Sequence, residues 1–193
     1  MRQTSPTGTL TLPGMEDVGL SPIRRQYVEL KRRQPDALLL FRLGDFFETF
    51  EDDAHLAARV LDITLTSRGD GVPLAGVPVK AAADYLRQLV GAGYRVAICE
   101  QVEDPRLARG LVRREVIETV TPGALLQEGW LAGGRNNFLV ALGPAPGGRV
   151  GLAAVDLSTG EFLLETLEVT GVAEAVGRLG PAEIVVPSGA APA

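Results

Sequence analysis

The chain has 193 residues, of which 46% are hydrophobic and 22% charged, and its formal net charge at pH 7 is −5. This composition suits one or two small globular domains with an apolar core. The apolar runs are short and interrupted by charges, and residues 1–17 hold no apolar stretch of signal-peptide length, so the sequence predicts neither a membrane span nor a secretory leader. A cytoplasmic location is therefore expected.

The single cysteine and the single histidine exclude several kinds of site, and the positive charges are unevenly distributed along the chain. Cys99 is the one cysteine, which rules out a disulfide within the chain and a cysteine metal site. His55 is the one histidine, so it has no metal-binding partner of its own kind. Of the 19 lysines and arginines, 16 fall within residues 1–123, which permits a local basic patch there despite the acidic total.

The chain opens with a predicted arm and a helix. Residues 1–20 are rich in Thr, Pro and Gly and are expected to form a flexible arm. Ser21 followed by Pro22 is typical of a helix N-terminus, and Pro35 is expected to end the helix.

A β-hairpin is predicted directly after this helix. The run 37–43 has the composition of a strand and a Gly-Asp pair breaks it, so Phe46 opens the second arm. Because side chains alternate between the two faces of a strand, Phe46 and Glu48 are expected on one face and Phe47 and Thr49 on the other. One face can then serve the core while the other presents an aromatic ring beside an acid.

Helices and strands alternate through the rest of the first 123 residues, which indicates an α/β fold with helices packed on a mixed sheet. The expected elements are a helix from Glu51, a short strand over 61–66, a loop over 67–71, a tight apolar connection over 74–78, a helix over 80–90, and strands over 94–102 and 112–120.

A second domain is predicted after a Gly- and Ala-rich linker. We expect an arm over 1–20, a first domain over 21–123, a linker over 124–136 and a second domain over 137–193. Within the second domain the predicted elements are strands over 138–142, 149–157, 161–167 and 183–186 and a helix over 172–179.

Segments along nearly the whole chain carry a resemblance to one family. They are residues 21–22, 27–31, 36–50, 61–66, 75–78, 97–102, 120–123 and 155–162. They are similar to the N-terminal region of the MutS family of DNA mismatch repair proteins. The resemblance implies a mismatch-recognition domain followed by a partial RNase H-like α/β connector domain, whose later strand and helices would fall after Ala193. A truncated piece of a longer protein is therefore expected.

The resemblance also implies roles for two residues of the hairpin. The family reads mispairs with a Phe-x-Glu element, which is here Phe46-Phe47-Glu48. Phe46 would enter the duplex from the minor groove and stack on a mispaired base, an interaction of about 1 to 3 kcal/mol that is indifferent to base identity. Glu48 would accept a hydrogen bond from the displaced base and repel the phosphates of an intact duplex.

Three cations are candidates for contacts to the DNA backbone or groove. Arg68, on a glycine-flanked loop, matches best, and Lys80 and Arg114 match less well. Val79 and Lys80 stand where many family members have Tyr-His, so a contact made by that histidine would here be made by lysine, reaching a phosphate.

Neither a catalytic residue nor a metal site nor a cofactor is expected within the chain. No Gly-x-x-x-x-Gly-Lys-[Ser/Thr] phosphate loop occurs in it. ATP and Mg²⁺ are the cofactors implied for the full-length family. Its implied partners are mismatched double-stranded DNA, a second copy of the protein and downstream mismatch repair proteins, with no membrane.

Two other classes of function remain open. One is a module that only binds protein partners. The other is a metal-dependent nuclease, since Asp156 resembles the first acid of an RNase H-type site and five acids lie close together at Asp45, Glu48, Glu51, Asp52 and Asp53. Structural roles for acids at a turn and at a helix N-terminus disfavour the nuclease.

Overall fold

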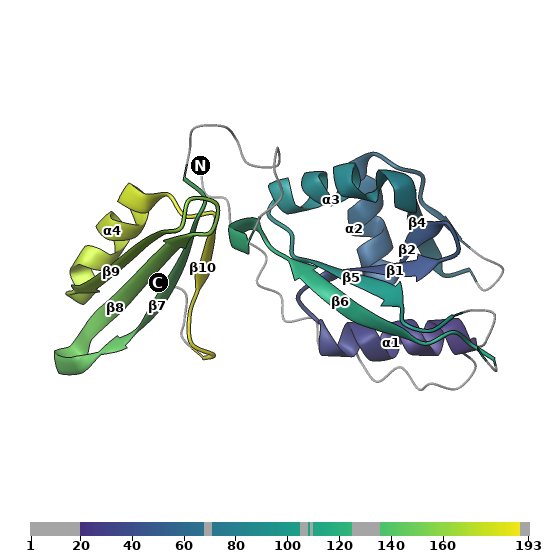
Figure 1. The fold of residues 1–193 in the computed structure, drawn as a ribbon, viewed down its shortest axis with the longest axis horizontal. Helices are drawn as coiled ribbons and strands as arrows, with labels where there is room; N and C mark the ends of the chain where they lie inside the picture. The colour runs from purple at the N-terminus through teal and green to yellow at the C-terminus, as the bar shows by residue number, and fades with distance from the viewer. Residues whose placement is uncertain (1–19, 68–70, 105–107, 109, 125–135, 190–193) are drawn as a thin grey trace.

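The structure of the protein is a computed structural model that describes residues 20–67, 71–104, 108, 110–124 and 136–189. Within these residues the chain forms a six-stranded sheet and a four-stranded sheet, each in its own lobe (Figure 1). Residues 1–19 of the expected arm, residues 125–135 of the expected linker, and Arg68 lie outside the described residues.

The first lobe is built on a mixed sheet, as the sequence predicted. Its strands lie in the order β3-β4-β2-β1-β5-β6, with β1 and β5 parallel and the other neighbours antiparallel. Its elements are α1 (Pro22–Arg33), β1 (Leu38–Leu43), β2 (Phe46–Phe50), α2 (Glu51–Leu61), β3 (Thr66–Ser67), β4 (Pro73–Pro78), the 3-10 turn η1 (Val79–Ala81), α3 (Ala82–Gly91), β5 (Val96–Gln101), β6 (Arg114–Val120) and the 3-10 turn η2 (Pro122–Ala124).

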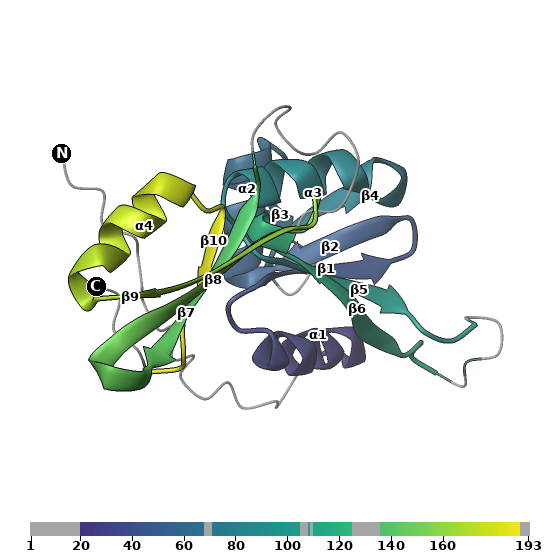
Figure 2. The same ribbon diagram turned by 60° about the vertical axis from the view of Figure 1, so that its left-hand side comes forward.

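Helices cover both faces of this sheet, with α2 and α3 on one face and α1 on the other (Figure 2). The side chains of β1 alternate accordingly. Leu38 and Leu40 join the apolar cluster beneath α2 and α3, whereas Leu39 and Phe41 join a second cluster with Tyr27 of α1. The central strand β1 is therefore buried on both sides. No helix in the described part of the chain is both long and apolar enough to span a membrane.

A buried carboxylate joins the elements of the first lobe. Asp53 accepts hydrogen bonds through Oδ2 from the backbone N of Leu39 and the hydroxyl of Tyr27, each at 3.0 Å. Its Oδ1 lies 2.9 Å from Nζ of Lys31. This one side chain connects α1, β1 and α2. Both of its oxygens are hydrogen-bonded within the fold, as a buried carboxylate requires.

Two predictions for the first lobe were wrong. The strand expected over 61–66 does not form, because α2 runs to Leu61 and Asp62 ends it in the left-handed conformation, leaving two residues of β3 to pair with β4. The connection expected over 74–78 is instead the strand β4, which pairs with β2 along its length. The prolines at 73 and 78 stand at the two ends of this strand.

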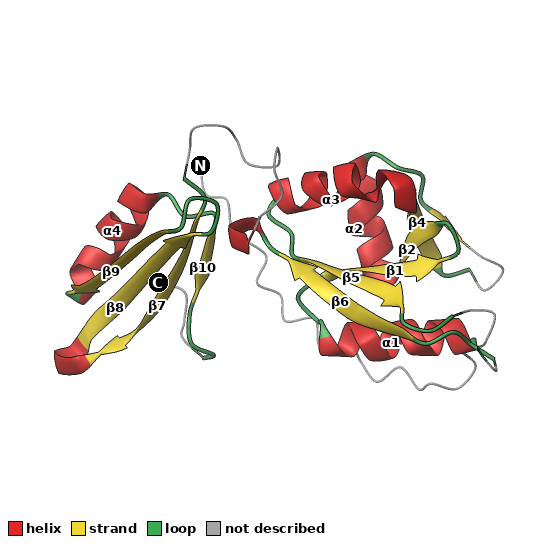
Figure 3. Ribbon diagram, viewed as in Figure 1, coloured by secondary structure: helices red, strands yellow, loops and turns green. Residues whose placement is uncertain are grey.

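The second lobe is a smaller α/β unit (Figure 3). Its strands lie in the order β10-β7-β8-β9, with β10 parallel to β7 and the other pairs antiparallel. Apolar side chains of β7 and β8 pack with Ala175 of α4 in one cluster. The elements are β7 (Phe138–Ala145), the 3-10 turn η3 (Pro146–Gly148), β8 (Arg149–Asp156), β9 (Glu161–Leu167), the 3-10 turn η4 (Val169–Gly171), α4 (Val172–Leu179) and β10 (Glu183–Val185).

The last turn of the first lobe packs against the second sheet. The backbone N of Gly123 donates to Oε2 of Glu183 at 3.2 Å, and Nδ2 of Asn137 donates to the carbonyl of Pro122 at 2.9 Å. A Cβ at Gly123 would lie 2.8 Å from Cβ of Glu183 and 3.1 Å from Cβ of Leu139. Glycine is therefore needed at this junction for close contact between η2 and the strands β7 and β10.

Candidate functional site

The ring of Phe46 is exposed at the start of a strand that is otherwise buried. Phe46 is 45% exposed, whereas Phe41, Phe47 and Phe50 of the same sheet are between 0% and 6% exposed. A ring exposed in this way is available to contact a molecule outside the fold.

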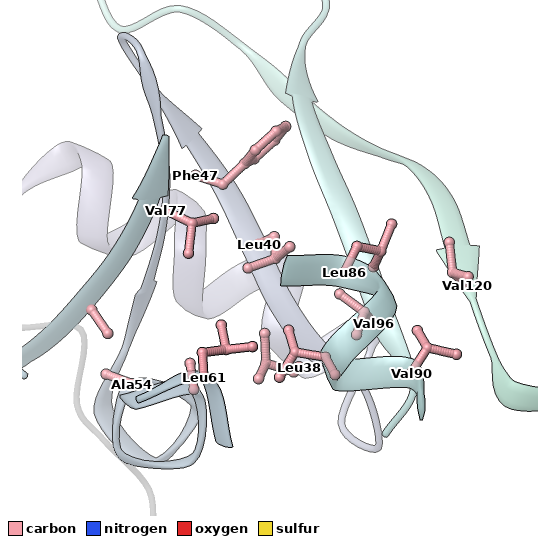
Figure 4. Close-up of a cluster of buried hydrophobic side chains, with 13 residues drawn as sticks. Leu38, Leu40, Phe47, Ala54, Leu61, Val77, Leu86, Val90, Val96 and Val120 are labelled. Atoms are coloured by element: carbon pink, nitrogen blue, oxygen red, sulfur yellow. The ribbon is translucent and has the colours of Figure 1, made fainter. Parts of the chain in front are cut away.

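Phe47, its neighbour, points to the opposite face of the sheet. Its ring belongs to the cluster beneath α2 and α3, with Leu40, Val77 and Leu86 (Figure 4). The guanidinium of Arg42 lies 5.6 Å from the centre of the ring. The predicted alternation is confirmed for the two rings: one serves the core and the other is presented to solvent.

Glu48 lies on the same face as Phe46, two residues further along β2. Its side chain is 8% exposed, and in the strand register Glu48 stands opposite Gly76 of β4 and Phe41 of β1. A Cβ built on Gly76 would lie 3.4 Å from Cγ of Glu48 and 3.8 Å from Cδ1 of Phe46. Gly76 thus lies next to the side chains of both Glu48 and Phe46.

The hairpin that carries Phe46 is held from both sides. Strand β2 pairs with β1 and with β4, and the backbone N of Val79 donates to the carbonyl of Asp45 at 2.9 Å. Arg42 donates from Nε to the carbonyl of Gly44 at 2.6 Å and from Nη1 to Glu100 at 2.8 Å. The role of Arg42 was missed by sequence reasoning, because Glu100 lies 58 positions away and no local pattern connects the two.

Arg114 is built into the fold behind the hairpin. It is 5% exposed, its Nε donates to the carbonyl of Arg42 at 2.6 Å, and its Nη1 donates to the carbonyl of Val112 at 2.8 Å. Its guanidinium lies 5.0 Å from the centre of the Phe41 ring, and burial lowers its pKa. This placement favours a structural role over the phosphate contact expected from the sequence.

Lys80 lies at the same end of the sheet as the exposed ring. It is exposed in η1, two residues after Pro78, which pairs with Phe46. The structure therefore brings Phe46, Glu48 and Lys80 to one end of the first lobe. Arg68 lies outside the described residues, so its position relative to this group is a prediction from the sequence.

Asp156, the acid that resembles the first acid of an RNase H-type site, is occupied by structural contacts. Oδ1 of Asp156 accepts hydrogen bonds from the hydroxyl of Ser158 at 2.6 Å and from its backbone N at 2.9 Å, and Oδ2 accepts from the backbone N of Asn137 at 3.0 Å. The hydroxyl of Ser158 is the main reason that the pKa of Asp156 lies below its ordinary value. Among the described residues no group of three or more His, Cys, Asp or Glu could hold a metal ion.

Cys99 and His55 lie apart from the group formed by Phe46, Glu48 and Lys80. Cys99 is fully buried in the cluster that faces α1, and burial raises the pKa of its thiol to about 12. The thiol is therefore protonated at physiological pH. His55 is exposed on α2.

Both lobes match families of known proteins. Residues 21–129 match the family MutS domain I, and residues 137–193 match MutS domain II. The chain is 48% identical over 177 residues to the DNA mismatch repair protein MutS of Methanothrix thermoacetophila, which covers 89% of this chain and 20% of the relative. It is 47% identical over 172 residues to that of Dehalococcoides mccartyi, covering 87% of this chain and 20% of the relative. The chain thus spans about a fifth of the length of the curated relatives it matches.

Proposed function

Because this chain belongs to the MutS family, whose domains I and II its two lobes match, we propose that it recognises mispaired or unpaired bases in duplex DNA. Residues 21–123 would make the contact with the mispair. Residues 137–193 would form the first part of a connector to the rest of a longer mismatch repair protein.

The exposed ring of Phe46 is the observation that carries this proposal. Separating two stacked base pairs costs a few kcal/mol, and least where a base is mismatched or unpaired. A ring that enters from the minor groove can therefore insert at a mispair more readily than at a sound base step. Its stacking energy does not depend on which base it meets, as a general sensor of mispairs requires.

Glu48 supplies the second part of the recognition. Its side chain lies on the same face of β2 as the ring and is largely withdrawn from solvent. A displaced base can donate a hydrogen bond to it, and a hydrogen bond to a charged group in a site of low solvent access is stronger than one in water. Intact duplex offers no such donor and brings its phosphates near an anion, so the acid penalises binding to matched DNA.

Contacts to the DNA backbone are proposed for two cations. Lys80 is exposed at the end of the sheet that carries Phe46, and Arg68 belongs to the glycine-flanked loop of the sequence. Few phosphate contacts release few counterions, so this part of the protein would bind DNA weakly by itself. We propose no catalysis and no cofactor for residues 1–193, and assign ATP, Mg²⁺, the second copy and the downstream repair proteins to the full-length protein.

Replacement of Phe46 by alanine in the full-length protein tests the proposal. Affinities are measured for one duplex with and without an unpaired thymine, at two salt concentrations. We expect Phe46→Ala to abolish the difference between the two duplexes without a change in melting temperature. A variant that still prefers the unpaired thymine would contradict the wedge.

Glu48→Gln tests the role of the acid with a side chain of the same size. Removal of the charge is expected to strengthen binding to the matched duplex and so to narrow the preference for the mismatch. A weaker affinity for matched duplex would show that the carboxylate does not act by repulsion.

A further inference from the structure

Gly76 occupies the interior of a strand, where glycine is disfavoured. It lies in β4 with Ala75 and Val77, both buried, on either side. Without a side chain, glycine loses more conformational freedom on folding than other residues and adds nothing to the packing of a sheet. A glycine at this position therefore calls for a physical reason.

The fold itself supplies none of the usual reasons. The backbone at Gly76 is not in the left-handed region that favours glycine. No bulge interrupts the strand, because the pairing of β2 with β4 runs without a shift from Phe46 opposite Pro78 to Phe50 opposite Leu74. Steric exclusion is also absent, since the nearest atoms to a Cβ at Gly76, Cγ of Glu48 and the carbonyl of Phe47, would both lie 3.4 Å away, an ordinary contact distance.

Gly123 shows what a structurally required glycine looks like in this molecule. A Cβ there would come within 2.8 Å of Cβ of Glu183, which is closer than real side chains approach. Gly76 meets no such obstacle. The remaining reason for a bare backbone in a strand is that something outside the fold approaches it closely.

We infer that Gly76 is a specificity-determining residue, whose missing side chain keeps open the space between the ring of Phe46 and the carboxylate of Glu48 for the edge of a displaced base. The inference rests on the proposed function. A base that stacks on the ring while donating a hydrogen bond to the acid has to lie over both side chains. Gly76 pairs with Glu48, and a Cβ at Gly76 would lie within 4 Å of both side chains. A side chain at this position would occupy the space that the base needs.

The test uses Gly76→Ala and Gly76→Val in the full-length protein. Affinity for the duplex with an unpaired thymine is expected to fall with the size of the new side chain, by about tenfold for valine, which corresponds to the loss of roughly one base-stacking contact. Affinity for matched duplex should stay the same. The melting temperature should stay the same or rise, because both residues suit a strand better than glycine does.

Gly143→Ala is the matched control. Gly143 also lies inside a strand, β7 of the second sheet, and a Cβ there would meet nothing within 4 Å. We expect this variant to bind both duplexes as the parent protein does. A loss of binding in Gly76→Ala that follows a fall in melting temperature would overturn the inference, because the glycine would then serve packing.

Phe46→Ala, measured in parallel, separates this inference from the proposed function. If Phe46→Ala loses the preference for the mismatch while Gly76→Val keeps it, the inference is wrong and the wedge stands. If Phe46→Ala keeps the preference, the proposed function is wrong and the inference falls with it.

Discussion

The two sheets of this protein differ in how completely they are covered. Helices pack on both faces of the six-stranded sheet, whereas in the four-stranded sheet the described residues place one helix, α4, against one face. Large apolar side chains are correspondingly exposed along β9, with Leu164 at 72% and Phe162 at 58%. Exposed apolar side chains are therefore common in the second sheet, whereas among the strands of the first sheet the exposed large apolar side chains are Phe46 at 45% and Ile117 of β6 at 58%. The proposed function accounts for the exposure of Phe46.

The largest effect should come from the ring that faces inward. Phe47→Ala removes a buried side chain from the cluster beneath α2 and α3 and is expected to lower the free energy of unfolding by about 3 to 5 kcal/mol. Chemical denaturation of Phe46→Ala and Phe47→Ala measures the difference. If Phe46→Ala lowered the free energy of unfolding as much as Phe47→Ala does, both rings would be core residues and the two rings would not differ in role.

The junction between the two sheets should be the next most sensitive point. Gly123→Ala forces a Cβ to within 2.8 Å of Glu183 and is expected to lower the free energy of unfolding by about 1 to 3 kcal/mol. The control is Gly177→Ala within α4, where a Cβ meets nothing within 4 Å and alanine should stabilise the helix by up to about 1 kcal/mol. Opposite signs for the two substitutions are the expected result, and a stabilised Gly123→Ala would mean that η2 does not pack on the second sheet.

Protonation of Asp156 at acidic pH should destabilise the second sheet. Because the folded protein lowers the pKa of this carboxyl, its ionised form stabilises the fold above the ordinary carboxyl pKa, and this stabilisation is lost as pH falls through the lowered value. Asp156→Asn is expected to reduce the fall in melting temperature between neutral and acidic pH. An unchanged pH profile in this variant would show that other acids control the response.

The smallest effect is expected on the open part of the second sheet. Leu164→Ser exchanges a side chain that is 72% exposed, so the free energy of unfolding should change by no more than about 0.5 kcal/mol in denaturation experiments. A large loss of stability would show that Leu164 packs against another part of the protein. The two sheets would then differ less in how far their apolar side chains are buried.

Local patterns in the sequence predicted much of the first lobe. Alternation along β2 was sufficient to place Phe46 and Phe47 on opposite faces, and Ser21 with Pro22 was sufficient to start α1. These features depend on residues only a few positions apart in the chain, so they can be predicted from a single sequence. The family resemblance added the roles of Phe46 and Glu48, which alternation alone does not give.

Features set by distant partners could not be predicted in this way. Strand β4 was mistaken for a connection because its prolines and Gly76 are typical turn residues, and only its pairing with β2 shows otherwise. The burial of Arg114 depends on Arg42 and Phe41, which lie more than 70 positions earlier in the chain. The role proposed for Gly76 follows from its place opposite Glu48, a relation that the linear sequence does not reveal.

The position of β2 inside the sheet has a mechanical consequence. A strand paired on both sides is held by two ladders of hydrogen bonds, whereas a strand at the edge of a sheet is held by one. In the proposed complex the ring of Phe46 is thus mounted on a stiff support. When a stiff body presses on a more compliant one, the compliant body deforms, so the strain of the contact would be taken up by the DNA and most readily at the base step that yields first.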